Sequence, residues 1–384
     1  MQHRDTASRT RPRPDTGPGL PPAGGEALPP EDLSSRLRAQ ELQAGDLLAR
    51  DLLAPYLHSL AADFLRSLRL HRESGQDPQG AAEAAEATRA LRGAARRISG
   101  TLHTFRPLTD TGWADTLRGE LAWLSGTLAR EHAYAGRLNR LLEALNRLSG
   151  AGGGAGGGTP ATPGARESAA SRAQPGGTLT VGAARAGALL ERQLTLARTR
   201  SHSAALQALG SSRFHAVADA VALLASDVPL GPAATAPAAE VLAPLAVGAE
   251  QRLKEAVAAL PLGRAAHPYN AEALVHGLAA TPTSEAQDAP WHQVRLLLRL
   301  HRYAQETFAA PAAPAGTCLA AQALDRHRDA AEAAGAAASA ARTPRIAPAT
   351  AYALGVLHAD QRHEVEAARF AFQQVWQRTA ATAP

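Results

Sequence analysis

Hydrophobic residues recur along most of the chain at intervals of three to five, which places them on one face of an α-helix. The first such run extends from Glu31 through Leu70, and Pro55 predicts a kink or break within it. Stretches rich in Gly and Pro separate the later runs. These later runs predict helices over residues 81–105, 113–148, 183–224, 238–260, 291–308, 318–341 and 347–379.

Two segments lack this periodicity altogether. Residues 1–30 are rich in Pro, Gly and Arg, which predicts a disordered N-terminal tail. Residues 150–178 consist mainly of Gly, Ala, Pro, Ser and Thr, and we expect a flexible insertion that either separates two domains or interrupts one. Residues 281–290 predict a shorter break between helices. The expected folded region is therefore residues 31–380, interrupted at 150–178.

Composition supports an all-α fold. Hydrophobic residues make up 45% of the 384 residues, but aromatic residues only 4%, so Leu and Ala must fill most of the core. Ala has the highest helix propensity and Leu follows closely, whereas the β-branched residues that favour strands are sparse. We find no convincing strand.

The net charge is modest, but nearly all of the basic residues are arginine. The formal net charge is +5, and Lys254 is the only lysine among the 40 basic residues. A GC-rich genome would favour arginine codons without any functional cause. Arginine also binds phosphate through a planar, bidentate fork that lysine lacks. The distribution of the arginines is therefore more informative than their number.

Several function classes find no support in the sequence. The chain contains no glycine-rich phosphate loop, no HExxH metal motif and no paired CxxC. Its single cysteine, Cys318, allows no intrachain disulfide and fits a reducing compartment. No apolar run approaches the length of a membrane span, and the N-terminus lacks the apolar region of a signal peptide. We therefore expect a cytoplasmic protein without a membrane partner, a metal site, a cofactor or an enzymatic activity.

Two predicted helices carry basic residues at a shared spacing. Positions 0, 3, 7 and 10 of a helix fall within roughly an 80° arc of one face. Arg97 lies off this arc. The first stripe comprises Arg89, Arg92, Arg96 and His103, and the second stripe comprises His292, Arg295, Arg299 and Arg302.

Like charges at this spacing repel one another and destabilise an isolated helix. Basic stripes with few acidic partners are therefore candidate binding sites for an external anion. The alternative interpretation is that each stripe is an ordinary solvent-exposed helix face. Glu306 is expected to orient Arg302 or Arg299, unless it forms only an ordinary ion pair four residues along the helix. Tyr303 accompanies it as a packing or orienting residue. His301, His327 and Arg328 are interpreted as surface residues.

This ordered pattern resembles the CHAD family, the conserved histidine α-helical domain. The family pattern is a His followed by Arg at +3 and basic residues at +7 and +10, and the second stripe matches it, including Arg302-Tyr303. Further similarity lies in Thr104–Leu108, Trp113–Asp115, Glu120–Leu124, Ser203–Leu209, Ser211–Phe214, Leu324–Asp329, Ala353–Leu357 and Phe372–Trp376. The chain resembles a stand-alone member without a CYTH domain.

The resemblance implies one helical domain of two pseudo-symmetric bundles, with about four helices each around a basic groove. It also implies that the partner is inorganic polyphosphate, since family members bind this polymer and some gather on polyphosphate granules. Arg213, after the predicted break at Ser211-Ser212, is a further candidate for this groove. The candidate contacts are thus Arg89, Arg92, Arg96, Arg97, His103, Arg213, His292, Arg295, Arg299 and Arg302, with Glu306 and Tyr303 orienting them.

The first repeat departs from the family pattern. Arg89 stands where the family has His, Ser99 where it has Arg, and His132-Ala133 where it has an Arg-Asp pair. These changes leave open a degenerate helical scaffold with little polyanion binding. Nucleic-acid binding is disfavoured because the stripes carry few aromatic residues for base stacking. A phosphohydrolase is disfavoured because the stripes lack a cluster of carboxylates. The sequence does not indicate whether the protein is a monomer or an oligomer.

Overall fold

The computed structural model describes residues 47–74, 80–150, 175–269, 281–308 and 315–381. Within these ranges the fold is all-α, as predicted, and extended pairing is limited to two isolated bridges, Leu48 with Pro237 and Thr109 with Leu230. The helices are α2 (Ala49–Ser74), α3 (Ala81–Thr104), α4 (Thr111–Leu148), α5 (Pro175–Leu209), α6 (Ser212–Ser226), α7 (Ala238–Val241), α8 (Ala243–Ala258), α9 (Leu262–Ala265), α11 (Thr281–Phe308), α12 (Ala315–Ala341) and α13 (Pro348–Ala381).

Two breaks that the sequence pattern suggested do not occur. Helix α2 continues through Pro55, and α11 begins at Thr281 and contains Pro290, where the sequence predicted a loop. A proline removes one backbone hydrogen bond, and buried side chains on either side of it offset that loss. Leu53 and Leu57 are fully buried beside Pro55, and Asp288 and Trp291 are buried beside Pro290.

The predicted helix over 183–224 is instead two helices. Helix α5 ends at Leu209 and α6 begins at Ser212, with Gly210 and Ser211 between them. The hydroxyl of Ser211 accepts a hydrogen bond from the backbone N–H of Phe214 at 3.2 Å and so caps α6. Helix α5 begins at Pro175, inside the predicted insertion. Residues 1–46, which hold the predicted tail and the start of the first predicted helical run, lie outside the described residues, as do residues 151–174.

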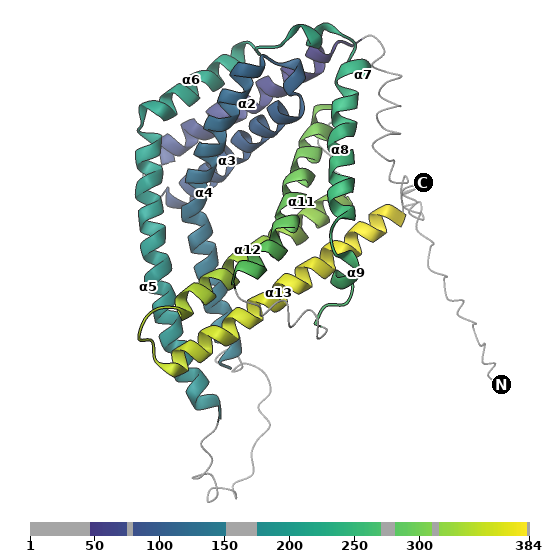
Figure 1. Cartoon of the computed structure of the whole chain (residues 1–384). Coiled ribbons are helices and arrows are strands. Elements are labelled where there is room, and N and C mark those ends of the chain that lie inside the picture. The colour runs from purple at the N-terminus through teal and green to yellow at the C-terminus, as the bar shows by residue number, and fades with distance from the viewer. Residues whose placement is uncertain (1–46, 75–79, 151–174, 270–280, 309–314, 382–384) are drawn as a thin grey trace, which may run out of the picture.

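The long helices α4 and α5 lie side by side and connect the two ends of the molecule (Figure 1). At one end, α2 packs against α3 and α6, and α3 packs against α4. At the other end, α11 packs against α8 and α12, and α12 packs along α13. Helix α11 also contacts α3, so the two helices that carry the basic stripes meet in the middle of the molecule.

The buried hydrophobic residues form three clusters. The first joins α2, α3, the first half of α4, α6 and α7, and includes Ala304 of α11. The second joins the end of α4 to α5, α12 and the start of α13. The third joins α8, α11, the start of α12 and the end of α13 around Trp291 and Phe372. The arrangement in two pseudo-symmetric bundles stays a prediction.

Candidate functional site

The contact between α3 and α11 depends on a glycine. A Cβ atom on Gly100 would stand 3.2 Å from Leu300 Cδ2 and closer still to the ring of Tyr303. The absence of a side chain at Gly100 thus allows the two backbones to approach each other. Tyr303 is buried there, and the Arg97 and Arg302 guanidinium carbons lie 6.0 and 5.3 Å from the centre of its ring.

Glu306 connects three helices next to this contact. Its carboxylate accepts hydrogen bonds from Arg97 Nε of α3 at 3.1 Å and from the Tyr56 hydroxyl of α2 at 2.9 Å. Arg302 Nε lies 3.2 Å from the same carboxylate. Burial and the Glu306 charge raise the pKa of Tyr56 far above its usual range, so Tyr56 remains a donor. Glu306 therefore engages Arg302, one of its two predicted partners, and also Arg97.

Three other arginines have no such partner. Arg92 and Arg96 of α3 and Arg299 of α11 form no ion pair with any residue that the structure describes. The Nε atom of each is buried without a hydrogen-bond acceptor in this part of the chain. A buried donor without an acceptor costs about 1–3 kcal/mol, and more when it is charged. These three guanidinium groups therefore lack a counter-charge among the described residues.

The pKa values show that these groups lie close together. Burial lowers the pKa of Arg299 to about 10, with further lowering by Arg295 and Arg96. Burial likewise lowers the pKa of Arg92 to about 10, aided by the positive charges of Arg96 and of Arg328 on α12. Arginines from α3, α11 and α12 thus share one electrostatic neighbourhood, which we call the central cluster: Arg92, Arg96, His292, Arg295, Arg299 and Arg328.

His292 is an exposed member of the central cluster. Partial burial lowers its pKa, while Asp288 and Glu332 raise it and Arg295 and Arg328 lower it. Its ring also stands at a steep angle to that of His327, with 5.4 Å between the ring centres. A bound anion would oppose the neighbouring positive charges and favour the protonated imidazole.

Helix α12 supplies carboxylates on the other side of the cluster. Asp325 pairs with Arg295, Asp329 accepts from Arg328 Nε at 3.0 Å, and Glu332 accepts from Arg137 of α4 at 2.5 Å. The sequence interpretation missed Arg137 and assigned Arg328 to the ordinary surface. The similarity of Leu324–Asp329 to a family motif was the signal that could have identified Arg328.

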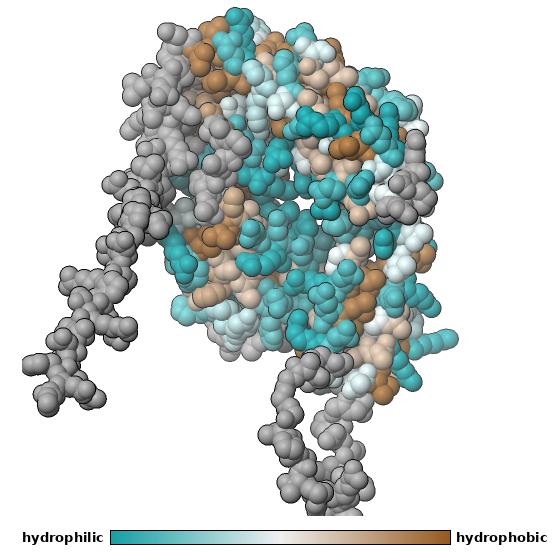
Figure 2. Space-filling model, turned by 180° about the vertical axis from the view of Figure 1, so that it is seen from behind, coloured by the Kyte–Doolittle hydropathy of each residue, from teal (hydrophilic) through white to brown (hydrophobic). Residues whose placement is uncertain are grey.

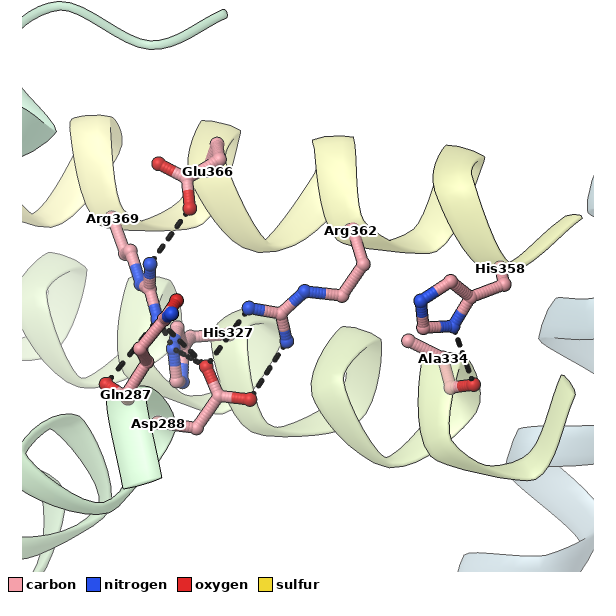
Figure 3. A network of polar contacts seen from close by, with 8 residues as sticks. All are labelled: Gln287, Asp288, His327, Ala334, His358, Arg362, Glu366 and Arg369. Carbon is pink, nitrogen blue, oxygen red and sulfur yellow. Dashed lines mark hydrogen bonds and ion pairs between the residues drawn. The ribbon is translucent and has the colours of Figure 1, made fainter. Parts of the chain in front are cut away.

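A buried polar network fixes α11 against α12 and α13 (Figure 3). Asp288 of α11 accepts from Arg362 Nη1 and from Arg369 Nη2 of α13, each at 2.7 Å. Burial raises the pKa of Asp288, but the hydrogen bonds and the positive charge of Arg362 lower it well below its usual range. Glu366 accepts from Arg369 Nη1 at 2.7 Å. This network sets the register of α11 and therefore the position of the second stripe.

His327 and His301 are buried, so their predicted placement at the surface is wrong. The His327 ring stacks on Trp291 with 5.6 Å between the ring centres, and Arg369 Nε donates to its Nε2 atom at 3.3 Å. Burial lowers the pKa of His327 to about 4, so the side chain is neutral near pH 7. The neutral imidazole packs against both the arginine and the aromatic ring without adding another charge.

Other candidate residues have contacts away from the central cluster. Arg89 is exposed and pairs with Glu86 on its own helix at 2.7 Å. His103 contacts Arg118 of α4 at 2.9 Å, and partial burial with the charges of Arg118 and Arg252 lowers its pKa.

Arg213 of α6 binds Glu120 through two hydrogen bonds of 2.7 and 3.2 Å, and its guanidinium stacks over Trp123 at 4.0 Å. All of these partners lie on α4. The interactions of the described residues thus give Arg213 no contact with the central cluster.

The surface around the middle of the molecule is hydrophilic. Figure 2 shows hydrophilic residues gathered around a hollow in the centre of this face. In the ranges that the structure describes, no three or more His, Cys, Asp or Glu side chains are grouped so that they could hold a metal ion. None of the described helices is long and apolar enough to cross a membrane.

Comparisons with known proteins agree on one family. The family model described as "CHAD domain" matches residues 60–337. The solved structure of PptA from Streptomyces chartreusis is 60% identical to this chain, with a TM-score of 0.69. That match covers 86% of this chain and 99% of the PptA chain. Among curated proteins, no significant match is found.

Proposed function

The chain belongs to the CHAD domain family, and from this premise we propose that it binds inorganic polyphosphate at the central cluster. The observation that carries the proposal is the set of guanidinium groups of Arg92, Arg96 and Arg299, for which the described residues provide no carboxylate. They come from two helices and face a third that carries Arg328. Such a cluster is stabilised when an anion compensates it.

The chemistry of the ligand fits these groups. Every internal phosphate of polyphosphate carries a negative charge, and guanidinium groups bind phosphate oxygens through paired, charge-assisted hydrogen bonds. Binding would also release counterions from the polymer, so that the affinity falls steeply as salt rises. His292 extends the cluster when it is protonated, because its pKa rises next to bound phosphate.

Nucleic acid is the weaker candidate for the same groups. Proteins that bind single strands usually stack bases on exposed aromatic rings. Tyr303 is the aromatic residue of the second stripe, and its ring is buried against Gly100. This observation favours a polyanion without bases.

The proposal is one of binding without turnover. The α12 carboxylates near the cluster are each engaged by an arginine, which supports an ionic rather than a metal-binding role for them. The physiological setting that we propose is the cytoplasm, with association with polyphosphate granules. The altered first repeat is compatible with this role, because Arg92 and Arg96 contribute to the cluster although Arg89 pairs elsewhere.

Replacement of the unpaired arginines tests the proposal. We expect the Arg92→Ala, Arg96→Ala, Arg299→Ala variant to lose at least about 100-fold in polyphosphate affinity, from the loss of three charged contacts. The matched control replaces Arg50, Arg66 and Arg198, which pair with Asp51, Asp63 and Glu131 elsewhere, and removes the same charge. Equal losses in the two folded variants would contradict a site at the central cluster. If polyphosphate is recovered intact after incubation with the protein and no phosphate is released, the result supports binding without turnover.

A further inference from the structure

Helix α12 lines the central cluster with acidic residues at a regular spacing. Asp325, Asp329 and Glu332 lie at positions 0, 4 and 7, on one face of the helix. The first and last are about 10.5 Å apart along the axis, from the rise of about 1.5 Å per residue. Asp325 pairs with Arg295 of α11, and Glu332 pairs with Arg137 of α4. Two carboxylates therefore hold two arginines from neighbouring helices.

In both pairs the carboxylate lies on the solvent side of the arginine. The Asp325 side chain is 54% exposed and its partner Arg295 is 14% exposed. The Glu332 side chain is 40% exposed and its partner Arg137 is 18% exposed. An anion that arrives from solvent therefore meets the carboxylate before it can reach the guanidinium group.

The two carboxylates also act on the rest of the cluster. Asp325 raises the pKa of Arg299, and Glu332 raises the pKa of His292. Their negative charges thus reach the groups that would bind phosphate, and they repel an anion that approaches from this side. Arg92, Arg96 and Arg299 have no carboxylate of their own and remain open to any polyanion.

We propose that Asp325 and Glu332 are specificity-determining residues, which cap Arg295 and Arg137 and admit only an unsubstituted phosphate chain to them. This inference rests on the proposed function. Polyphosphate joins its phosphates directly through shared oxygens, so its closely spaced negative charges replace the carboxylates at the recessed guanidinium groups. A nucleic acid has a sugar between successive phosphates, so its charges lie farther apart and it does not displace a charged carboxylate. Discrimination comes from a repulsive element against the wrong ligand, in addition to attraction to the right one.

The salt dependence of binding separates the two ligands. The slope of log affinity against log salt counts the phosphate charges that the protein neutralises, at about 0.7 per contact for a single strand. In the wild type, single-stranded DNA would engage the open arginines only. With the carboxylates neutralised it would engage Arg295 and Arg137 as well, and its slope would steepen by about 1.4. Polyphosphate engages both arginines already, so its slope would not change.

The experiment is calorimetric titration of the full chain with long-chain polyphosphate and with single-stranded DNA at several salt concentrations. The test variant is Asp325→Asn with Glu332→Gln. The control variant is Asp63→Asn with Glu131→Gln, which gives the same change in net charge. Asp63 and Glu131 are similar to the test residues in exposure and are also paired, with Arg66 and with Arg198 and His202.

We expect the test variant to bind DNA about tenfold more tightly than the wild type, with the steeper slope, while the polyphosphate slope is unchanged. The control variant should match the wild type. If the wild type binds polyphosphate but the test variant shows no change in DNA affinity or slope, this inference is overturned and the proposed function stands. An equal gain in both variants would also overturn it, because net charge would then suffice. Absence of polyphosphate binding by the folded wild type would overturn the proposed function itself.

Discussion

Tyr303 of α11 lies so close to Gly100 of α3 that a Cβ atom on Gly100 would stand 2.5 Å from Cδ2 of the tyrosine ring. The contact joins the two helices that carry the basic stripes. The guanidinium groups of Arg97 and Arg302 also lie near the Tyr303 ring. The relative position of Arg96 and Arg299 in the central cluster therefore depends on a residue that carries no charge.

The Gly100→Ala variant should be destabilised by about 1–3 kcal/mol, because the added methyl group overlaps the Tyr303 ring. Gly119→Ala on α4 is the matched control, since nothing lies within 4 Å of a Cβ atom there. We expect that control to be stabilised by up to about 1 kcal/mol from helix propensity. Chemical denaturation measures both. A Gly100→Ala variant as stable as the control would contradict the close approach of α3 and α11.

Replacement of Glu306 by Gln should destabilise the fold and strengthen its response to polyphosphate. The carboxylate is mostly buried between Arg97, Arg302 and the Tyr56 hydroxyl, and its neutralisation leaves two arginines facing each other. We expect a loss of about 1–3 kcal/mol in the free energy of unfolding. The rise in melting temperature on addition of polyphosphate should exceed that of the wild type, because two more guanidinium groups can bind phosphate. A smaller rise would mean that Glu306 serves to orient these arginines for the ligand.

Stability should fall as the pH is lowered from about 6.5 to about 4. Burial lowers the pKa of His327 from 6.5 to about 4, so in this window the unfolded chain binds a proton that the native protein does not. The difference corresponds to roughly 3 kcal/mol. His292 and His103 act in the same direction, because their pKa values are also lowered. Asp288 adds no loss in this window, since its pKa lies below the usual 3.8.

Denaturation curves at pH 7, 5.5 and 4.5 measure this dependence. The His327→Gln variant should lose most of it, because glutamine can accept from Arg369 and does not titrate. An unchanged pH dependence in that variant would show that another group is responsible.

Single alanine variants should separate the central cluster from the other candidate residues. Arg299→Ala should weaken polyphosphate binding by about tenfold or more, as expected for the loss of a charge-assisted contact. Arg213→Ala and Arg89→Ala should change it by less than about twofold, because their guanidinium groups bind Glu120 and Glu86. Calorimetry with polyphosphate checks all three. A loss for Arg213→Ala as large as that for Arg299→Ala would contradict a site confined to the centre of the molecule.

Helical periodicity was sufficient to predict the all-α fold and most helices, since leucine spacing along one face follows directly from helix geometry. The periodicity gave the wrong helix bounds where burial in the tertiary structure outweighs the local helix propensity. Pro290 predicted a break, yet burial of Asp288 and Trp291 on either side keeps α11 continuous. Asp288, which accepts from both Arg362 and Arg369, lies in the segment that the pattern predicted to be a loop.

The site was predictable only in part, for a related reason. The spacing of Arg92, Arg96 and Arg299 places them on helix faces, and the resemblance to a known family indicated which faces to compare. The contributions of Arg328 and Arg137 depend on how α12 and α4 pack, which no single-helix pattern encodes. Which arginines lack a carboxylate depends on residues distant in sequence, as Arg97 with Glu306 and Arg213 with Glu120 illustrate.

The most direct test of polyphosphate binding is calorimetric titration of the wild-type protein with long-chain polyphosphate at about 50 and 200 mM salt, beside single-stranded DNA. Binding through the three open arginines and the two displaced ion pairs predicts tight binding at the lower salt. It also predicts a loss of about 100-fold or more at the higher salt, and weaker binding to DNA at both. No binding heat with polyphosphate from the folded protein, or an affinity independent of salt, would contradict the assignment of the central cluster as a polyphosphate site.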